Sequence, residues 1–131
     1  RAAFLLSQSA FKIMSKKKSG RVVNLSSGGW QYGGGNKTVH YSVSKAAIEA
    51  LTIATAKIGA KDKILVNCIR PGATRTNFHK KMGRTNLIKR AKLVPLKRMA
   101  EPDEISNAVI FLCSEKSSFI TNSIIDVRGG E

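Results

Sequence analysis

Tyr41 and Lys45, in the string YSVSK, are the residues whose types and spacing could do acid–base chemistry. In a helix, positions four apart share one face, with Cβ atoms about 5 to 6 Å apart. A free tyrosine has a pKa of about 10, too high for proton transfer near neutrality, and a fixed ammonium beside it favours the phenolate. The pair could therefore give a proton to a developing alkoxide or take one from an alcohol. Tyrosine and lysine at this spacing also occur on solvated helices, so the interpretation depends on the surrounding segments.

Two further segments could contribute to the same site. Ser27 ends a predicted strand 14 residues before Tyr41, and its hydroxyl can donate a hydrogen bond to a substrate oxygen or accept one. Pro71 and Gly72 follow the next strand, where a rigid residue and then one without Cβ would let backbone groups approach a flat cofactor ring. An ordinary loop serine and a strand-ending turn are the structural alternatives.

The hydrophobic pattern predicts the elements that must bring these residues together. Strands alternating with helices imply right-handed crossovers and an α/β fold, a doubly wound parallel sheet with helices on both faces. Ligands of such sheets bind beyond the carboxyl ends of the strands, so the loops after Leu25, Arg70 and Val127 are expected at one edge. The predicted elements are a helix over residues 1–15, a strand over 21–25, a helix from about 39 to 59, a strand over 64–70, a mobile segment with helical pieces over 73–97, a helix starting near Pro102 and a strand over 124–127.

The length of 131 residues, 42% of them hydrophobic, suits a single domain, and no apolar run approaches the roughly 18 to 20 residues of a membrane span. The helical pattern starts at the first residue without a cap, which suggests part of a longer domain of a soluble, cytoplasmic protein. Cys68 and Cys113 lie in apolar segments and are expected to be buried thiols. His40 and His79 have no cysteine or carboxylate at ligand spacing, so no metal site is expected.

The formal charge of +15 is the most unusual bulk feature. It admits a second interpretation, a non-catalytic basic fragment or scaffold that binds nucleic acid or an acidic protein. The sequence has no aromatic stripe of the kind that stacks bases, so nucleic acid is the less favoured partner. An acidic N-terminal half outside these residues would also balance the charge.

With these segments in order, the chain resembles the short-chain dehydrogenase/reductase family along nearly all of its length. The segments that carry the resemblance are the interface helix RAAFLLSQSAF, the serine strand NLSS, the Tyr-x-x-x-Lys helix YSVSKAAIEALT, the Pro-Gly strand and loop VNCIRPGATRT, the final helix EPDEISNAVIFLCSEKSSFIT and the final strand IIDVRGG. The resemblance implies the C-terminal half of a Rossmann-type fold and an NAD(P)-dependent oxidoreductase acting on a carbonyl or alcohol. It also implies a homo-oligomer, a dimer or tetramer, in which Ala10, Ile13, Leu51 and Ala54 would face a twofold partner.

Family roles carry over where the residues match. The resemblance implies that Tyr41 is the catalytic acid or base, that Lys45 is its electrostatic partner and a ribose ligand, and that Ser27, rather than Ser26, orients the substrate carbonyl. The implied contacts with the nicotinamide end of NAD or NADP also involve the loop residues Pro71, Gly72, Thr74 and Thr76. Thr74 replaces the usual aliphatic residue, and the stretch from Ser27 to Tyr41 is one residue longer than the common spacing.

The departures from the family pattern concern the cofactor's other end. The family's phosphate loop, T-G-x-x-x-G-x-G, is absent, as are its adenosine-binding residue and its Asn-Ala-Gly strand. Gly33, Gly34 and Gly35 precede Tyr41 and do not open a helix after a first strand. Residues 1–131 are therefore expected to form one partial domain that lacks the dinucleotide phosphate-binding half, is inactive alone and leaves the choice between NAD and NADP open.

A basic segment could select the substrate. Nine lysines and arginines and no acidic residues lie from Arg75 to Arg98, the region that forms the family's lid. A basic lid would steer a substrate carried on an anionic handle, such as an acyl group on acyl carrier protein or coenzyme A. This resembles the 3-oxoacyl carrier-protein reductases and predicts a 3-oxoacyl thioester as the substrate. A solvated, lysine-rich surface is the alternative.

Overall fold

The computed structural model describes residues 1–33, 36, 38–83 and 86–131. Three strands form one parallel sheet in the order β1 (Gly20–Leu25), β2 (Ile64–Pro71) and β3 (Ile124–Val127). The helices are α1 (Ala2–Lys17), α2 (Val39–Gly59), α3 (Asn77–Lys81), α4 (Leu87–Leu93) and α5 (Pro102–Cys113), and the 3-10 turns are η1 (Gly28–Tyr32), η2 (Ala60–Asp62) and η3 (Glu115–Ser117).

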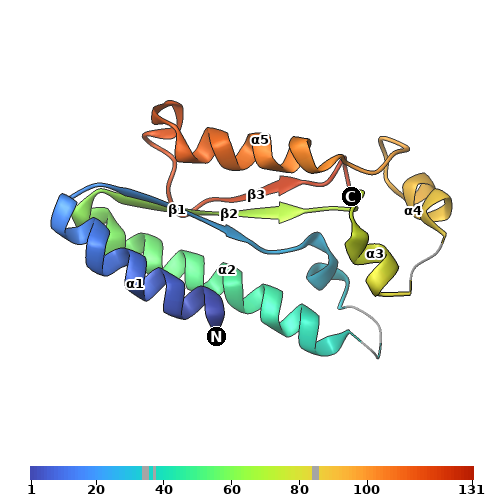
Figure 1. Cartoon of the computed structure of the whole chain (residues 1–131), viewed down its shortest axis with the longest axis horizontal. Coiled ribbons are helices and arrows are strands. Elements are labelled where there is room, and N and C mark those ends of the chain that lie inside the picture. The colour runs from blue at the N-terminus through green and yellow to red at the C-terminus, as the bar shows by residue number, and fades with distance from the viewer. Residues whose placement is uncertain (34–35, 37, 84–85) are drawn as a thin grey trace.

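The sheet lies between two layers of helix (Figure 1). α1 and α2 lie side by side on one face, and α5 covers the other. Parallel neighbours need a crossover connection, which α2 supplies between β1 and β2 and which α5 supplies before β3. The predicted α/β class, a parallel sheet with helices on both faces, is confirmed.

The three strands end at the same edge of the sheet. Leu25 pairs with Ile69, and Pro71 pairs with Val127, so the loops after β1, β2 and β3 leave the sheet together. α3 and α4 lie beyond this edge (Figure 1). It is the edge at which the sequence predicts the site.

β2 is the centre of the core because it has a strand on each side and helices over both faces. Its fully buried apolar side chains are Ile64, Val66, Cys68 and Ile69. Asn67 is also buried, and its amide is satisfied, because Nδ2 donates to the Ile120 carbonyl at 2.8 Å and Oδ1 accepts from the Ser123 amide at 3.1 Å. These hydrogen bonds hold the turn that leads into β3 against the central strand.

The predicted helices form, but the apolar stripes that predict the first two do not all face the sheet. The buried residues of α2 are Ser42, Glu49, Thr52, Ala56 and Gly59. Ala54 and Ile58, which belong to the predicted apolar stripe, are exposed, as are Leu6 and Ile13 on α1. Small and polar side chains thus let α2 approach the sheet closely, while larger apolar side chains remain on the outside. None of the described helices has the length and hydropathy needed to cross a membrane.

Two expectations about burial are wrong. Cys113 is exposed, because Leu112 takes the core-facing position in the last turn of α5; Cys68 is buried, and both thiols are free. The segment 73–97 contains two short helices as expected, but Ala73 and Val94 are buried and pack with Met99 in a small apolar cluster. The two ends of this segment are therefore part of the core.

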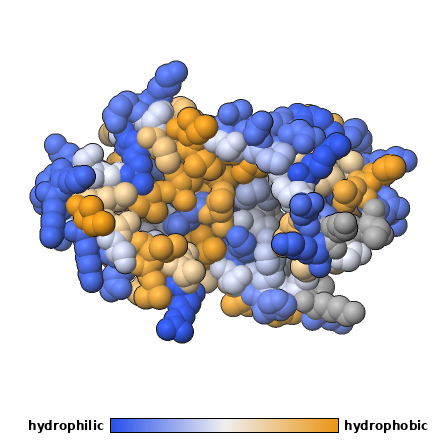
Figure 2. Space-filling model, in the orientation of Figure 1, coloured by the Kyte–Doolittle hydropathy of each residue, from blue (hydrophilic) through white to orange (hydrophobic). Residues whose placement is uncertain are grey.

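Among the residues that the structure describes, β1 is an edge strand, because β2 is its one strand neighbour there. Figure 2 shows apolar side chains gathered between α5 and α1, on the side of the molecule where β1 lies in Figure 1. Contiguous exposed apolar surface commonly marks a surface that another segment or chain covers.

Candidate active site

A cleft of about 350 Å³ opens at the carboxyl edge of the sheet. It is lined by all of the residues that the sequence places in the site, namely Ser27, Tyr41, Lys45, Pro71, Gly72, Thr74 and Thr76. The loop after β1, the first turns of α2 and the loop after β2 meet there. The predicted convergence at one edge is confirmed, while the role of each residue stays a prediction.

Tyr41 and Lys45 lie together near the start of α2. The Lys45 ammonium lies 5.8 Å from the centroid of the Tyr41 ring and donates to the carbonyl oxygen of Leu25 at 2.8 Å. Partial burial lowers the pKa of Lys45 from its ordinary value, because fewer water molecules solvate the ammonium. A charge that water screens less acts more strongly on a neighbouring phenol.

The two serines after β1 have different environments. Ser26 is buried, and its hydroxyl can donate a hydrogen bond to Glu49 Oε1 at 2.7 Å or to the Lys45 carbonyl at 3.0 Å. Ser27 is half-buried at the cleft, and its hydroxyl caps η1 by accepting from the Gly29 amide at 3.2 Å. Because Ser26 is engaged in the interior, this geometry supports the choice of Ser27 as the serine that meets a ligand.

The turn after β2 packs tightly against the turn after β3. The Gly72 amide donates to the Val127 carbonyl at 3.0 Å, and a Cβ at Gly72 would lie 2.8 Å from Arg128 Cα. The neighbouring backbone therefore requires glycine here, which is a different reason from the expected approach of a cofactor ring. Two threonines make hydrogen bonds within the loop. Thr74 Oγ1 donates to the Gly72 carbonyl at 3.2 Å, and Thr76 Oγ1 accepts from the Phe78 backbone amide at 3.4 Å.

α3, the first helix of the basic segment, packs directly on the tyrosine. The rings of Phe78 and Tyr41 lie 6.1 Å apart, centroid to centroid, with 34° between their planes. The rings of Phe78 and His79 meet edge to face at 5.9 Å. These contacts are not predicted from the sequence, although an aromatic residue two positions after Thr76 is a signal for them.

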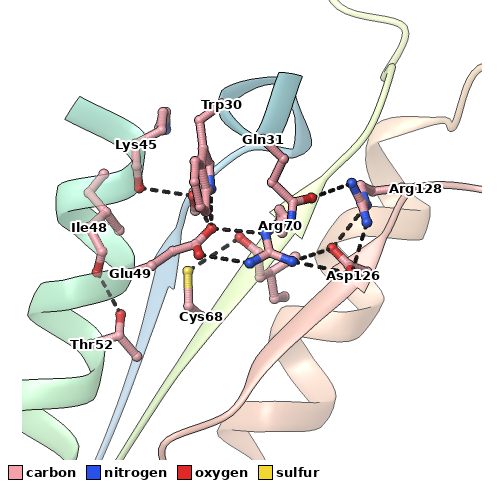
Figure 3. Close-up of polar contacts among 12 residues, drawn as sticks. Trp30, Gln31, Lys45, Ile48, Glu49, Thr52, Cys68, Arg70, Asp126 and Arg128 are labelled. Atoms are coloured by element: carbon pink, nitrogen blue, oxygen red, sulfur yellow. Dashed lines mark hydrogen bonds and ion pairs between the residues drawn. The ribbon is translucent and has the colours of Figure 1, made fainter. Parts of the chain in front are cut away.

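Beneath the cleft, Glu49 collects donors from three other segments (Figure 3). Its Oε1 accepts from Trp30 Nε1 at 2.6 Å, from Arg70 Nε at 2.9 Å and from the Ser26 hydroxyl, and its Oε2 accepts from Arg70 Nη2 at 2.7 Å. Burial opposes ionisation, but the hydrogen bonds from Arg70, Ser26 and Trp30 outweigh it and lower the pKa of Glu49. The hydrogen bonds with Glu49 in turn raise the pKa of Arg70.

The same network extends to β3 (Figure 3). Arg70 Nη1 donates to the two carboxylate oxygens of Asp126 at 3.1 and 3.3 Å. Arg128 Nη2 donates to Asp126 Oδ2 at 3.0 Å, and its Nη1 donates to Gln31 Oε1 at 2.7 Å. This network is not predicted from the sequence, although an arginine within the apolar run ILVNCIR and a glutamate one turn after Lys45 are signals for it.

Comparison with known proteins decides the family. Residues 1–131 match the family described as enoyl-(acyl carrier protein) reductase. The chain is also 34% identical to a solved short-chain dehydrogenase/reductase family protein, with a TM-score of 0.85 over 97% of this chain and 52% of that one. The chain belongs to the short-chain dehydrogenase/reductase family.

Relatives of this short-chain dehydrogenase/reductase include named reductases. It is 37% identical over 127 residues to a 3-oxoacyl-(acyl-carrier-protein) reductase of Aquifex aeolicus and 40% identical over 131 residues to an acetoacetyl-CoA reductase of Acinetobacter sp.. Each match covers 97% of this chain and 51% of the relative. A solved acetoin dehydrogenase of Salmonella typhimurium is 30% identical, with a TM-score of 0.81 over 98% of this chain and 50% of that one. The chain thus spans about half the length of the relatives it matches.

The family implies a nicotinamide cofactor, and the donors in the cleft fit its nicotinamide and ribose end. Lys45 and the hydroxyls of Tyr41 and Thr76 can meet ribose and amide oxygens. The backbone amide of Ala73 donates a hydrogen bond to a carboxylate oxygen of Glu131 at 3.3 Å. This amide can therefore bind an oxygen atom at the edge of the cleft. The phosphate-binding sequence T-G-x-x-x-G-x-G does not occur in the 131 residues. Within the described ranges, no group of three or more metal-ligating side chains is placed to hold a metal ion.

Proposed function

We propose that the protein is a cytoplasmic NAD(P)-dependent oxidoreductase that transfers hydride between a nicotinamide cofactor and a carbonyl or alcohol, with 3-oxoacyl thioesters as the substrate class. The observation that carries the proposal is that Ser27, Tyr41 and Lys45 line one cleft with the loop after β2. Relatives named 3-oxoacyl-(acyl-carrier-protein) reductase and acetoacetyl-CoA reductase support the substrate class.

Each residue of the site has a distinct part in the proposed reaction. In the direction of reduction, the Tyr41 hydroxyl donates its proton to the substrate oxygen as the carbonyl becomes an alkoxide. The Lys45 ammonium stabilises the phenolate that remains, and the Ser27 hydroxyl donates a hydrogen bond that orients the same oxygen. A bound nicotinamide cofactor supplies the hydride in reduction and accepts it in oxidation.

We assign the two ends of the cofactor to different parts of the protein. The nicotinamide and its ribose are assigned to Tyr41, Lys45, Pro71, Gly72, Thr74 and Thr76. The adenosine and pyrophosphate are assigned to residues outside these 131, which would also choose between NAD and NADP. The edge strand β1 and the apolar surface beside it support this assignment, because proteins cover open sheet edges and apolar patches (Figure 2). On this proposal the 131 residues form a partial domain that is inactive alone.

The charges of the lid support a substrate with an anionic handle. Three arginines of the lid pair with carboxylates, Arg75 with Glu101, Arg90 with Glu131 and Arg98 with Glu104. Lys81, Lys89 and Lys92 are exposed, and in the part of the chain that the structure describes they form no ion pair. Their charges are therefore available to attract the phosphates of coenzyme A or the acidic surface of an acyl carrier protein.

Assembly as a dimer or tetramer is part of the proposal. α1 and α2 form a groove of about 370 Å³ lined by the apolar side chains Phe4, Phe11, Leu51 and Ile58. Ile13 and Ala54, which the resemblance places against a partner, are exposed, and Ala10 and Leu51 are half-buried. A second copy packed on this surface would remove the exposed apolar side chains from water.

The test uses the protein expressed from its complete coding sequence. Reduction of acetoacetyl-CoA is followed by the absorbance of NADH and, separately, of NADPH, in the unaltered protein and in Tyr41→Phe. We expect turnover that falls about 100- to 10,000-fold in the variant, because Phe lacks the proton that Tyr41 transfers. If a panel of carbonyl and alcohol substrates gives no turnover that depends on Tyr41, the proposal fails. A salt titration of nucleic-acid binding then tests the non-catalytic alternative.

A further inference from the structure

Glu49 is a buried carboxylate for which the proposed chemistry has no use. Tyr41, Lys45 and Glu49 follow one another at four-residue spacing on α2, so Glu49 lies one turn deeper on the face that carries the acid–base pair. It is only 5% exposed. Burying a carboxylate is unfavourable unless it is paired and hydrogen-bonded. The partners of Glu49 meet both conditions.

The partners of Glu49 are next to the reacting segments in sequence. Ser26 directly precedes Ser27, the serine proposed to orient the substrate oxygen, and Trp30 lies in the turn η1 that Ser27 caps. Arg70 is the next-to-last residue of β2, close to the turn that follows this strand, and it contacts Glu49 through two nitrogens. The Arg70 guanidinium also lies 5.7 Å from the centroid of the Trp30 ring. The carboxylate thus joins the helix of the acid–base pair to both loops that complete the cleft (Figure 3).

The geometry requires a carboxylate and not merely a polar side chain. Four hydrogen bonds from three side chains converge on the two oxygens of Glu49. An ionised carboxylate has only acceptor sites, whereas a glutamine in its place would present an NH₂ group to one set of these donors. A buried guanidinium or indole that faces an NH₂ group must move away or lose its partner.

We propose that Glu49 is a positioning residue, whose carboxylate holds the loop of Ser27 and the turn after β2 in place relative to Tyr41. The inference rests on the proposed function and deepens it. Displacement of reacting groups by about 1 Å is sufficient to reduce a reaction rate on the order of 100-fold. The carboxylate acts through its neighbours and does not touch the substrate.

The alternative is that Glu49 and Arg70 form an ion pair that only stabilises the fold. Replacing a buried ion pair by apolar side chains of similar volume is often neutral or stabilising, whereas removing one partner is strongly destabilising. The double variant Glu49→Leu/Arg70→Met therefore separates the two roles. If the ion pair only stabilises the fold, the two apolar side chains can take its place. If the carboxylate positions the loops, they cannot.

The experiment compares Glu49→Gln and the double variant with Asp62→Asn, in the protein expressed from its complete coding sequence. Asp62 is a matched control, because it is also a buried carboxylate in an ion pair, with Lys18, but it lies just before β2 at the opposite end of the sheet from the cleft. All assays are run well below the lowest melting temperature. The measurements are kcat and KM for acetoacetyl-CoA, the Kd for NADH and NADPH, and quenching of Trp30 fluorescence by acrylamide.

We expect Glu49→Gln to lower kcat about 10- to 100-fold and to weaken cofactor binding. We expect the double variant to recover the melting temperature without recovering kcat, while Asp62→Asn loses stability only. Trp30 should become more accessible to acrylamide in both Glu49 variants, and Trp30→Phe identifies its signal.

The outcomes separate the two proposals. The positioning role is overturned, and the proposed function stands, if the unaltered protein turns over and one of two results is found. Either Glu49→Gln has the same kcat as Asp62→Asn, or the double variant recovers kcat. No turnover by the unaltered protein overturns the proposed function, and unchanged Trp30 accessibility and cofactor affinity in Glu49→Gln overturn the positioning role without any reference to turnover.

Discussion

The ammonium of Lys45 lies 2.8 Å from the carbonyl oxygen of Leu25, the last residue of β1. This hydrogen bond crosses from α2 to the sheet and restricts a side chain that otherwise has several rotatable bonds. The positive charge is therefore held at one place, beside the Tyr41 ring and next to the loop that carries Ser27. A charge held in place before reaction stabilises a phenolate without the cost of reorganising the site.

Lys45→Met should remove the charge while keeping much of the side chain's volume. We expect kcat/KM for acetoacetyl-CoA to fall about 100- to 10,000-fold, because the variant lacks the ammonium that we propose assists proton transfer by Tyr41. Lys57→Met, an exposed change near the end of the same helix, is the control and should keep its activity. Equal activities in the two variants would contradict the role of Lys45.

Glu49 should make the stability of the protein depend on pH. Because the pKa of Glu49 in the folded protein lies below its ordinary value of 4.5, its contribution is fully present above that pH and is lost as pH falls through the lowered value. Glu49→Gln should therefore be less stable than the unaltered protein at neutral pH, and the difference should shrink on acidification. Urea denaturation over a series of pH values measures it, with Glu115→Gln as an exposed control. A difference that stays constant across this range would argue against the stated cause.

Gly72→Ala tests the close approach of the two turns. The added Cβ would lie 2.8 Å from Arg128 Cα and must displace backbone, so we expect a loss of about 1 to 3 kcal/mol in the free energy of unfolding. Gly29→Ala is the matched control, since the nearest atom to its Cβ is a side-chain oxygen of Ser27 at 3.4 Å, and it should change stability by less than about 0.5 kcal/mol. Equal effects in chemical denaturation would show that the packing at Gly72 is not the reason for glycine.

Lys89→Glu/Lys92→Glu tests whether the lid attracts an anionic handle. We expect KM for acetoacetyl-CoA to rise about 10-fold or more at low salt, with little change for acetoacetyl-N-acetylcysteamine, which carries no phosphate. The rise should diminish as the ionic strength increases, because salt screens exposed charges. The same change in KM for both thioesters would mean that these lysines act on the lid's conformation and not on the handle.

Phe4→Lys/Ile13→Lys tests the proposed assembly surface on α1. Both side chains are exposed, at 56% and 61%, so lysine can be accommodated in a single copy without loss of core packing. We expect a smaller species in analytical ultracentrifugation and an unchanged far-UV circular dichroism spectrum. If the variant sediments with the same coefficient as the unaltered protein, the interface lies elsewhere.

Local pattern was a good guide to the elements and a poorer guide to their orientation. The apolar spacing that predicts α2 includes Ala54 and Ile58, which are exposed, whereas Glu49 and Thr52 are buried. The period of a helix is visible in its sequence, but which side meets the sheet depends on what the partners offer. Thr52 is buried because its hydroxyl accepts from the Asn24 amide at 2.9 Å, a partner that no local rule identifies.

The sequence by itself determined the order of helices and strands, the shared helical face of Tyr41 and Lys45, and the convergence of the loops after the strands. These follow from short-range rules, namely the period of each element and the direction of parallel strands. The tertiary structure decided that Glu49 meets Arg70, 21 residues away, that Phe78 packs on Tyr41, and that the approach of Arg128 requires glycine at position 72. Such contacts depend on how closely separate elements pack, and the spacing of residues along one element carries no information about that distance.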